Sequence, residues 1–291
     1  MSSRILPEFD LLVPASTTEA INLLAHYQNR AQLIAGGTDM VVAMKANLSA
    51  EVLISLSEVG GLDYIDFNPD SGLHIGARAT VAQILETPEI QTLYPALWQA
   101  AWVFATPQIR TAATVIGNVL RGSPAGDCSC ALMALGGRVI LQSQSGKREV
   151  SIEEFWTGYN QNARQSDELV LEIIIDPPQQ QTGSAFRRMT RVNEDLAKLN
   201  GEVRLEMNGN VCTSARLAMG CVGPTTLRLP KTEQLLTGEE ITPELLAHVV
   251  DTVPTEISPI DDKRSTAEYR LMVSGVVMKR LIEQAQRAAT A

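Results

Sequence analysis

The sequence has few of the residues that bind metals or cross-link a chain. Its 291 residues include four cysteines and three histidines, with no CxxC pair and with the histidines far apart. A structural zinc or iron–sulfur site within the chain is therefore not expected. The one close pair, Cys128 and Cys130, has two interpretations. It is either two small buried apolar side chains, which is common for free cysteine, or a redox-active thiol near a cofactor.

Long apolar runs and an excess of positive charge are also missing. No run approaches the roughly 20 apolar residues needed to span a bilayer. Residues 1–10 lack the basic and apolar regions of a signal peptide, so we expect a cytoplasmic protein without a membrane partner. The net charge of -9 repels phosphate backbones, so nucleic acid is not an expected partner either.

Aromatic residues make up only 4 % of the chain, so we expect a core of aliphatic side chains and alanine. The hydrophobic share of 45 % and the charged share of 20 % are typical of a soluble globular protein. The length allows two or three domains. The sequence pattern divides the chain into residues 1–57, 58–178 and 179–291.

Residues 1–57 follow the pattern of a small α/β unit. Ser16 or Thr17 can cap a helix that continues through the apolar residues after it. Residues 31–34 and 52–56 predict strands. The glycine turn and the apolar stretch between them predict a helix, which completes a strand–helix–strand unit.

The remainder predicts a second α/β unit and then an antiparallel sheet. In residues 58–178, strands are expected at 72–78 and 169–175, and two prolines end the unit. The segment Asn208–Asn210, with its central glycine, predicts a hairpin. Residues 179–291 are therefore expected to form a three-stranded sheet with helices, and the fold class is α+β.

Two glycine-containing turns carry the clearest chemical signal. Residues 33–40 follow a strand, and their glycines would let a phosphate approach backbone N–H groups without a Cβ in the way. Residues 104–127 contain a second such turn at Gly117, and Asp127 can accept hydrogen bonds from hydroxyl groups. Each turn alone is a weak signal, because glycine turns are common and neither has the Rossmann or P-loop spacing.

Together the two turns resemble the motifs of the FAD-binding subunits of molybdenum hydroxylases, the group of xanthine and carbon monoxide dehydrogenases. The family's AGGTDL pattern is similar to AGGTDM at residues 35–40. Its QIRNxATIGGN…SPAGD pattern is similar to residues 108–118 and 123–127. Further similar pieces follow in the same order along nearly the whole chain, among them ARLAMG at 215–220 and STAEYR at 265–270.

The resemblance implies a fold and a set of cofactor contacts. The fold would be an FAD-binding domain of the PCMH, or vanillyl-alcohol-oxidase-like, type in two α/β subdomains, followed by a C-terminal antiparallel sheet with helices. The 33–40 turn would hold the FAD diphosphate, and Arg187 would stabilise the reduced flavin. The residues at cofactor-binding positions of the family are Gln32, Leu33, Ile34, Ala35, Gly36, Gly37, Thr38, Asp39, Met40, Phe104, Ala105, Ile109, Ala113, Thr114, Gly117, Asn118, Leu120, Asp127, Leu169, Val170 and Arg187.

Three departures from the family pattern affect this interpretation. Ile116 stands where the family has the first glycine of a pair, and Thr111 stands where it has asparagine. Residues 128–130, Cys-Ser-Cys, replace Thr-Ala-Pro. A β-branched side chain at position 116 could crowd a ligand or force a different backbone angle.

The resemblance also implies partners and an activity. A large subunit would carry the molybdenum cofactor and a small subunit two [2Fe–2S] clusters. This chain would pass electrons from those clusters through FAD to NAD or another acceptor, in a dimer of heterotrimers. No catalytic acid or base and no metal ligand is expected in this chain. Two alternatives stay open: a free-standing FAD oxidoreductase, and a flavin-less scaffold or regulatory relative, which Ile116 would explain.

Three further features have structural interpretations. Trp98 and Trp102, four residues apart on a predicted helix, are expected to pack in a core or an interface. Glu153 is expected to be a solvated residue in the first turn of a helix. His74, in a predicted strand, is expected to be a hydrogen-bonded structural histidine.

Overall fold

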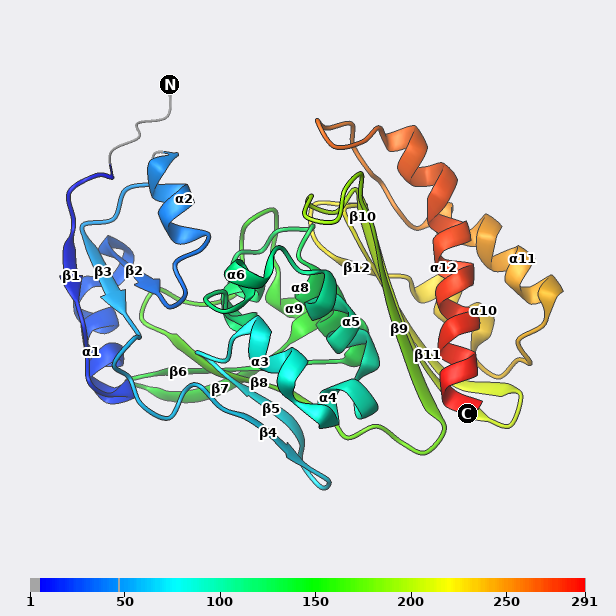
Figure 1. Ribbon diagram of the computed structural model, residues 1–291, viewed down its shortest axis with the longest axis horizontal. Coiled ribbons are helices and arrows are strands. Elements are labelled where there is room, and N and C mark those ends of the chain that lie inside the picture. The colour runs from blue at the N-terminus through cyan, green and yellow to red at the C-terminus, as the bar shows by residue number, and fades with distance from the viewer. Residues whose placement is uncertain (1–5, 47, 291) are drawn as a thin grey trace.

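Three β-sheets follow one another along the long axis of the described part of the molecule (Figure 1). The computed structural model describes residues 6–46 and 48–290. Parallel strands, antiparallel strands and many helices occur together, which confirms the predicted α+β class. The predicted limits at 57/58 and 178/179 fall in connections between sheets, and the division into three domains remains a prediction.

The N-terminal sheet is parallel, with β3 between β1 and β2. β2, α2 and β3 form the predicted strand–helix–strand unit. Of the two predicted capping residues, Ser16 is the one that caps α1, because its Oγ accepts the N–H of Glu19 at 3.2 Å. The elements are β1 (Asp10–Leu12), α1 (Thr17–Tyr27), a 3₁₀ turn (Gln28–Arg30), β2 (Ala31–Ile34), α2 (Met40–Lys45) and β3 (Val52–Ser55).

The central sheet has the strand order β4-β5-β8-β6-β7, with every neighbouring pair antiparallel. Helix α8 is buried along its whole length. Cys128 and Cys130 lie on it and are fully buried, which confirms that they are small core residues. The elements are β4 (Ile65–Asn68), β5 (Gly72–Gly76), α3 (Val81–Glu86), α4 (Pro88–Leu93), α5 (Pro95–Val103), α6 (Pro107–Arg110), α7 (Val115–Leu120), α8 (Asp127–Leu135), β6 (Arg138–Ser143), β7 (Gly146–Ser151), α9 (Ile152–Phe155) and β8 (Leu169–Ile175).

The C-terminal sheet is antiparallel, as predicted, but it has four strands where the sequence predicted three. The order is β12-β11-β10-β9. The missed strand, β12, has only two residues, too few for a periodic pattern. The predicted hairpin is confirmed, with Gly209 at a φ of 59° between β10 and β11. The elements are β9 (Thr182–Met189), β10 (Leu199–Asn208), β11 (Val211–Gly220), β12 (Leu227–Arg228), α10 (Pro230–Leu236), α11 (Pro243–Thr252), a 3₁₀ turn (Val253–Thr255) and α12 (Ala267–Thr290).

Helices cover both faces of the C-terminal sheet, and Figure 1 shows the long helix α12 beside its outer face. On that side β9 lies against α12 so closely that a Cβ on Gly183 would stand 2.0 Å from the Ala285 carbonyl oxygen. On the opposite face, the N–H of Ala96 in α5 donates to Ser184 Oγ at 3.3 Å. The sheet therefore joins the central part of the molecule to the C-terminal helices.

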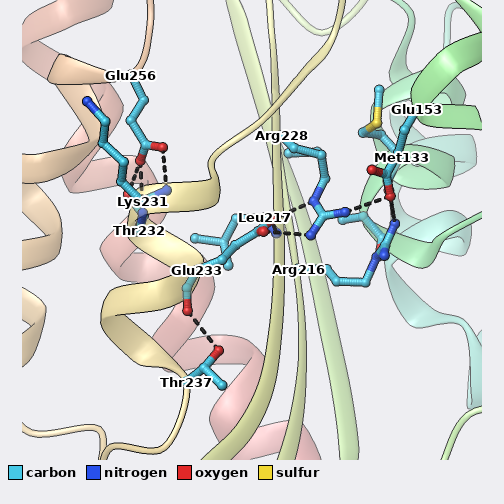
Figure 2. A network of polar contacts seen from close by, with 12 residues as sticks. Met133, Glu153, Arg216, Leu217, Arg228, Lys231, Thr232, Glu233, Thr237 and Glu256 are labelled. Atoms are coloured by element: carbon cyan, nitrogen blue, oxygen red, sulfur yellow. Dashed lines mark hydrogen bonds and ion pairs between the residues drawn. The ribbon is translucent and has the colours of Figure 1, made fainter.

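A polar network also connects the central and C-terminal parts (Figure 2). Glu153, in the first turn of α9, accepts hydrogen bonds from Arg216 and from Arg228 Nη1, the latter at 2.7 Å. Arg228 also contacts Glu233 of α10, which accepts the N–H of Leu217 at 2.8 Å. Glu153 is exposed in the first turn of a helix, as predicted. It also accepts hydrogen bonds from two arginines that lie more than sixty residues away in the sequence, which no local pattern indicates.

The other features interpreted as structural are packed or hydrogen-bonded. His74 Nδ1 lies 2.9 Å from Glu172 Oε2, and its Nε2 lies 3.1 Å from Ser71 Oγ. Trp98 packs against the main core, as predicted, and stacks on Trp102 with ring centroids 5.3 Å apart. Trp102 is 59 % exposed and lies outside the core, and its packing in an interface stays a prediction. None of the helices in residues 6–46 and 48–290 has both the length and the apolar character that crossing a bilayer requires.

Candidate cofactor-binding site

A cavity of about 500 Å³ lies where the N-terminal and central parts of the chain meet. The turn between β2 and α2, helix α7, the start of β8 and the loop at 160–164 line it. Seventeen of the predicted cofactor-binding residues line this cavity: Gln32, Leu33, Ile34, Ala35, Gly36, Gly37, Thr38, Asp39, Met40, Phe104, Ala113, Thr114, Gly117, Asn118, Leu120, Leu169 and Val170.

The two glycine motifs touch each other at Gly36. A Cβ at this position would lie 1.8 Å from the carbonyl oxygen of Ala112, so the two backbones approach as closely as glycine allows. The next residue, Gly37, has a φ of 70°, which turns the chain into α2 at little steric cost. The close approach explains why segments some 75 positions apart in the sequence line one wall of the cavity.

Helix α7 begins at the second motif. Thr114 caps it, because its Oγ1 accepts the N–H of Gly117 at 3.0 Å. Backbone bonds hold this turn against the start of α3: the N–H of Val81 donates to the Ala113 oxygen at 2.9 Å, and the N–H of Val115 donates to the Ala79 oxygen at 3.1 Å. The second motif is thus fixed from two sides before any ligand binds.

Ile116 does not need an unusual backbone angle. It lies in the first turn of α7, in helical conformation, and its residue surface is 3 % exposed. Although Ile116 is among the lining residues, its side chain packs in the main hydrophobic core. The cavity therefore remains open despite the glycine-to-isoleucine departure.

Four predicted residues lie outside the lining of the cavity. Ala105 follows Phe104 and has a φ of 40°, which is uncommon for a residue with a side chain. Ile109 lies on α6 and is 38 % exposed. The remaining two, Asp127 and Arg187, lie at the junction with the C-terminal sheet and on that sheet.

Asp127 is buried in a cluster of its own. Its Oδ2 accepts a hydrogen bond from Arg188 Nη1 at 2.9 Å, and its Oδ1 accepts one from Asn200 Nδ2 at 2.9 Å. Burial raises the pKa of Asp127 to about 6, although Arg188 and Asn200 both act to lower it. The structure therefore shows Asp127 joining α8 to β9 and β10, and its predicted contact with FAD remains a prediction.

Arg187 and Arg188 point to opposite faces of β9, because side chains alternate along a strand. Gly183, Ala185 and Arg187 share the face that packs on α12, and Arg187 is exposed there. Arg188 lies on the other face, where its side chain is 5 % exposed and contacts Asp127. Neighbouring residues of a strand lie on opposite faces of the sheet. Of the two arginines, Arg188 is therefore the one directed toward the central part of the chain.

Sequence reasoning missed part of the cavity wall. Arg121 follows α7, and Arg164 lies in the loop before β8. No local motif marks these positions, since the loop reaches the cavity only through long-range hydrogen bonds. The other lining residues missed are Ala43, Leu48, Leu56, Ala77, Asn160 and Asn162.

Comparison with known proteins adds an independent observation. The family model for the FAD binding domain in molybdopterin dehydrogenase matches residues 7–178, and that for the CO dehydrogenase flavoprotein C-terminal domain matches residues 184–285. The nicotinate dehydrogenase FAD-subunit of Eubacterium barkeri is 30 % identical over 286 residues, covering 96 % of each chain. The carbon monoxide dehydrogenase medium chain of Hydrogenophaga pseudoflava is 29 % identical over 282 residues, covering 97 % of this chain and 98 % of that one.

The similarity extends to the three-dimensional structure. A solved structure of carbon monoxide dehydrogenase from Hydrogenophaga pseudoflava matches with a TM-score of 0.94 at 28 % identity, covering 98 % of this chain and 99 % of that one. The match includes both the central part that forms the cavity and the C-terminal sheet. The chain therefore belongs to the family of FAD-binding oxidoreductase subunits of molybdenum hydroxylases.

Proposed function

We propose that this chain is the FAD-carrying electron-transfer subunit of a heteromeric molybdenum hydroxylase. A large subunit with the molybdenum cofactor would pass electrons to the [2Fe–2S] clusters of a small partner subunit. This chain would receive the electrons from those clusters and deliver them to NAD or another acceptor. The complex would be a cytoplasmic dimer of heterotrimers. The observation that carries the proposal is the meeting of both glycine motifs in one cavity, in a chain similar over nearly its full length to FAD-carrying dehydrogenase subunits.

The residues present fit a flavin dinucleotide. Gly36 and Gly37 line the cavity and add no side chain to it, which suits the approach of a diphosphate to the backbone. Leu169 and Val170 at the start of β8, with Phe104, supply apolar surface suited to a ring system. A small flexible ligand without phosphate would use only part of this lining.

The residues of the chain act by binding and positioning. Bound FAD supplies the electron-transfer chemistry, so the protein needs no acid or base of its own for that step. Thr114 and the α7 turn would hold one side of the dinucleotide, and the 33–40 turn would hold the other. The stabilisation of reduced flavin by Arg187 stays a prediction. The neighbouring Arg188 faces α8 and pairs with Asp127, and neither arginine is among the residues that line the cavity.

Co-purification tests the proposed assembly. A tagged version of the chain, expressed in its own host, should co-purify with a large subunit that contains molybdenum and a small subunit that contains iron and acid-labile sulfide. Metal analysis of the purified complex measures both. A chain that binds FAD but purifies alone, and that reduces an acceptor unaided, would instead support the free-standing oxidoreductase. The flavin-less alternative loses its motivation, because Ile116 packs in the core rather than closing the cavity.

A further inference from the structure

Two arginines, Arg121 and Arg164, line the same cavity. Among the residues that the structure describes, neither guanidinium lies within ion-pair distance of a carboxylate, whereas thirteen such contacts involve other groups. Asp39 is the one acidic residue among the described residues that line the cavity. The cavity wall therefore carries an excess of positive charge in a chain with a net charge of -9.

Arg164 is held in place by neutral partners. Its Nη1 donates to the carbonyl oxygens of Gln165 at 3.0 Å and Glu168 at 2.8 Å, which leaves its other N–H groups for a ligand. The Glu168 carboxylate is already engaged by Arg148, whose Nη2 donates to Oε2 at 2.8 Å. Burial lowers the pKa of Arg164, while Glu168 and Asp167 raise it, and the group stays protonated. An anion in the cavity would compensate this partly desolvated charge.

The loop with Arg164 is fastened to the end of α7, beside Arg121. Asn162 makes the connection: its Nδ2 donates to the Leu120 oxygen at 2.9 Å, and its Oδ1 accepts the N–H of Arg164 at 3.1 Å. The N–H of Asn160 donates to the Gly122 oxygen at 3.0 Å. The two arginines therefore come from segments that are hydrogen-bonded to each other, and both contribute to the cavity wall.

We propose that Arg121 and Arg164 form a cationic pair that binds the diphosphate of FAD together with the Gly36–Gly37 turn. The pair makes the cavity selective for a nucleotide with a diphosphate over one without it. Guanidinium groups suit this task because their N–H groups can contact two phosphate oxygens at once. This inference rests on the proposed assignment of the cavity to the cofactor.

The test measures binding to the apoprotein by calorimetry with three probes: FAD, ADP, which keeps the diphosphate, and adenosine, which lacks it. Wild type is compared with R164Q, R121Q and the charge-retaining R164K. Arg280, an exposed residue of α12 far from the cavity, provides the matched control R280Q. Thermal unfolding shows whether each variant is folded.

R164Q should weaken FAD and ADP about tenfold, the loss expected for one charge-assisted hydrogen bond. Adenosine binding should stay the same. R121Q should show the same pattern with a smaller loss, since Arg121 is exposed. R164K should recover part of the affinity, R280Q should match wild type, and added salt should weaken ADP less in the glutamine variants than in wild type.

Equal losses for ADP and adenosine, or unchanged FAD affinity in both R164Q and R121Q, would overturn the cationic pair while leaving FAD binding by the chain intact. A folded wild-type chain that binds neither FAD nor ADP would refute the proposed function and the pair with it.

Discussion

Replacing Gly36 by alanine should separate the two glycine motifs. The added Cβ would lie 1.8 Å from the Ala112 carbonyl oxygen and 3.2 Å from the Ala113 Cα. Both neighbours are backbone atoms, so no flexible side chain can move aside. Reaching ordinary van der Waals contact requires a displacement of roughly 1.5 Å between the β2–α2 turn and the segment before α7.

The magnitude follows from this overlap. Forcing one extra carbon into a packed site costs about 1–3 kcal/mol, and each kcal/mol lowers the unfolding midpoint by about 2–4 °C in a protein of this size class. The same displacement widens the cavity wall where both motifs would contact FAD. A loss of about 1.4 kcal/mol of binding free energy corresponds to a tenfold larger dissociation constant. We therefore expect FAD affinity to fall at least tenfold.

Gly60→Ala is the matched control, because a Cβ at Gly60 meets no atom within 4 Å and its backbone is unstrained. Scanning calorimetry of the apoproteins and titration with FAD measure both effects. An unchanged FAD affinity and unfolding midpoint in Gly36→Ala, equal to those of Gly60→Ala, would refute the close approach of the two motifs.

Two substitutions outside the cavity have distinct pH dependences. Glu202 is fully buried and neither carboxylate oxygen has a partner in the described structure, so burial raises its pKa well above its usual range. The folded state keeps the Glu202 proton while the unfolded chain loses it, so Glu202 destabilises the fold increasingly as pH rises above the unfolded pKa of about 4.3. Glu202→Met should therefore raise the unfolding midpoint, and the gain should be larger at pH 8 than at pH 5. An equal gain at both pH values would contradict this. For Glu153, burial acts to raise the pKa, but Arg216 and Arg228 outweigh it and lower the pKa. The stability that the ionised Glu153 contributes is present above its unfolded pKa and is lost as pH falls through its folded pKa. Glu153→Gln should therefore lower the free energy of unfolding by about 1 kcal/mol at pH 7 and by little at low pH. Calorimetry that finds the same loss at both pH values would exclude the ion pairs as its cause.

Local chemistry made much of the fold predictable. Ser16 and Thr80 cap their helices because side-chain oxygens satisfy the first free N–H groups. Asn208–Asn210 forms its hairpin because Gly209 adopts a positive φ without a Cβ penalty. Such signals lie within a few residues of the element that they define, so a sequence displays them directly.

The parts that sequence could not predict depend on long-range contacts. The two arginines in the cavity wall are one case, because the bond from Asn162 to the Leu120 oxygen joins segments 42 residues apart. The faces of Arg187 and Arg188 are another, because they depend on the register of β9 against β10, in which Arg187 pairs with Gly201. Neither the loop nor the register has a local marker.

The most direct test of the central claim is the absorbance spectrum of the purified chain, with the released cofactor identified after denaturation. The account predicts flavin bands near ~370 and ~450 nm and one FAD per chain. A folded, colourless chain that takes up no added FAD would contradict the assignment of the cavity between β2, α7 and β8.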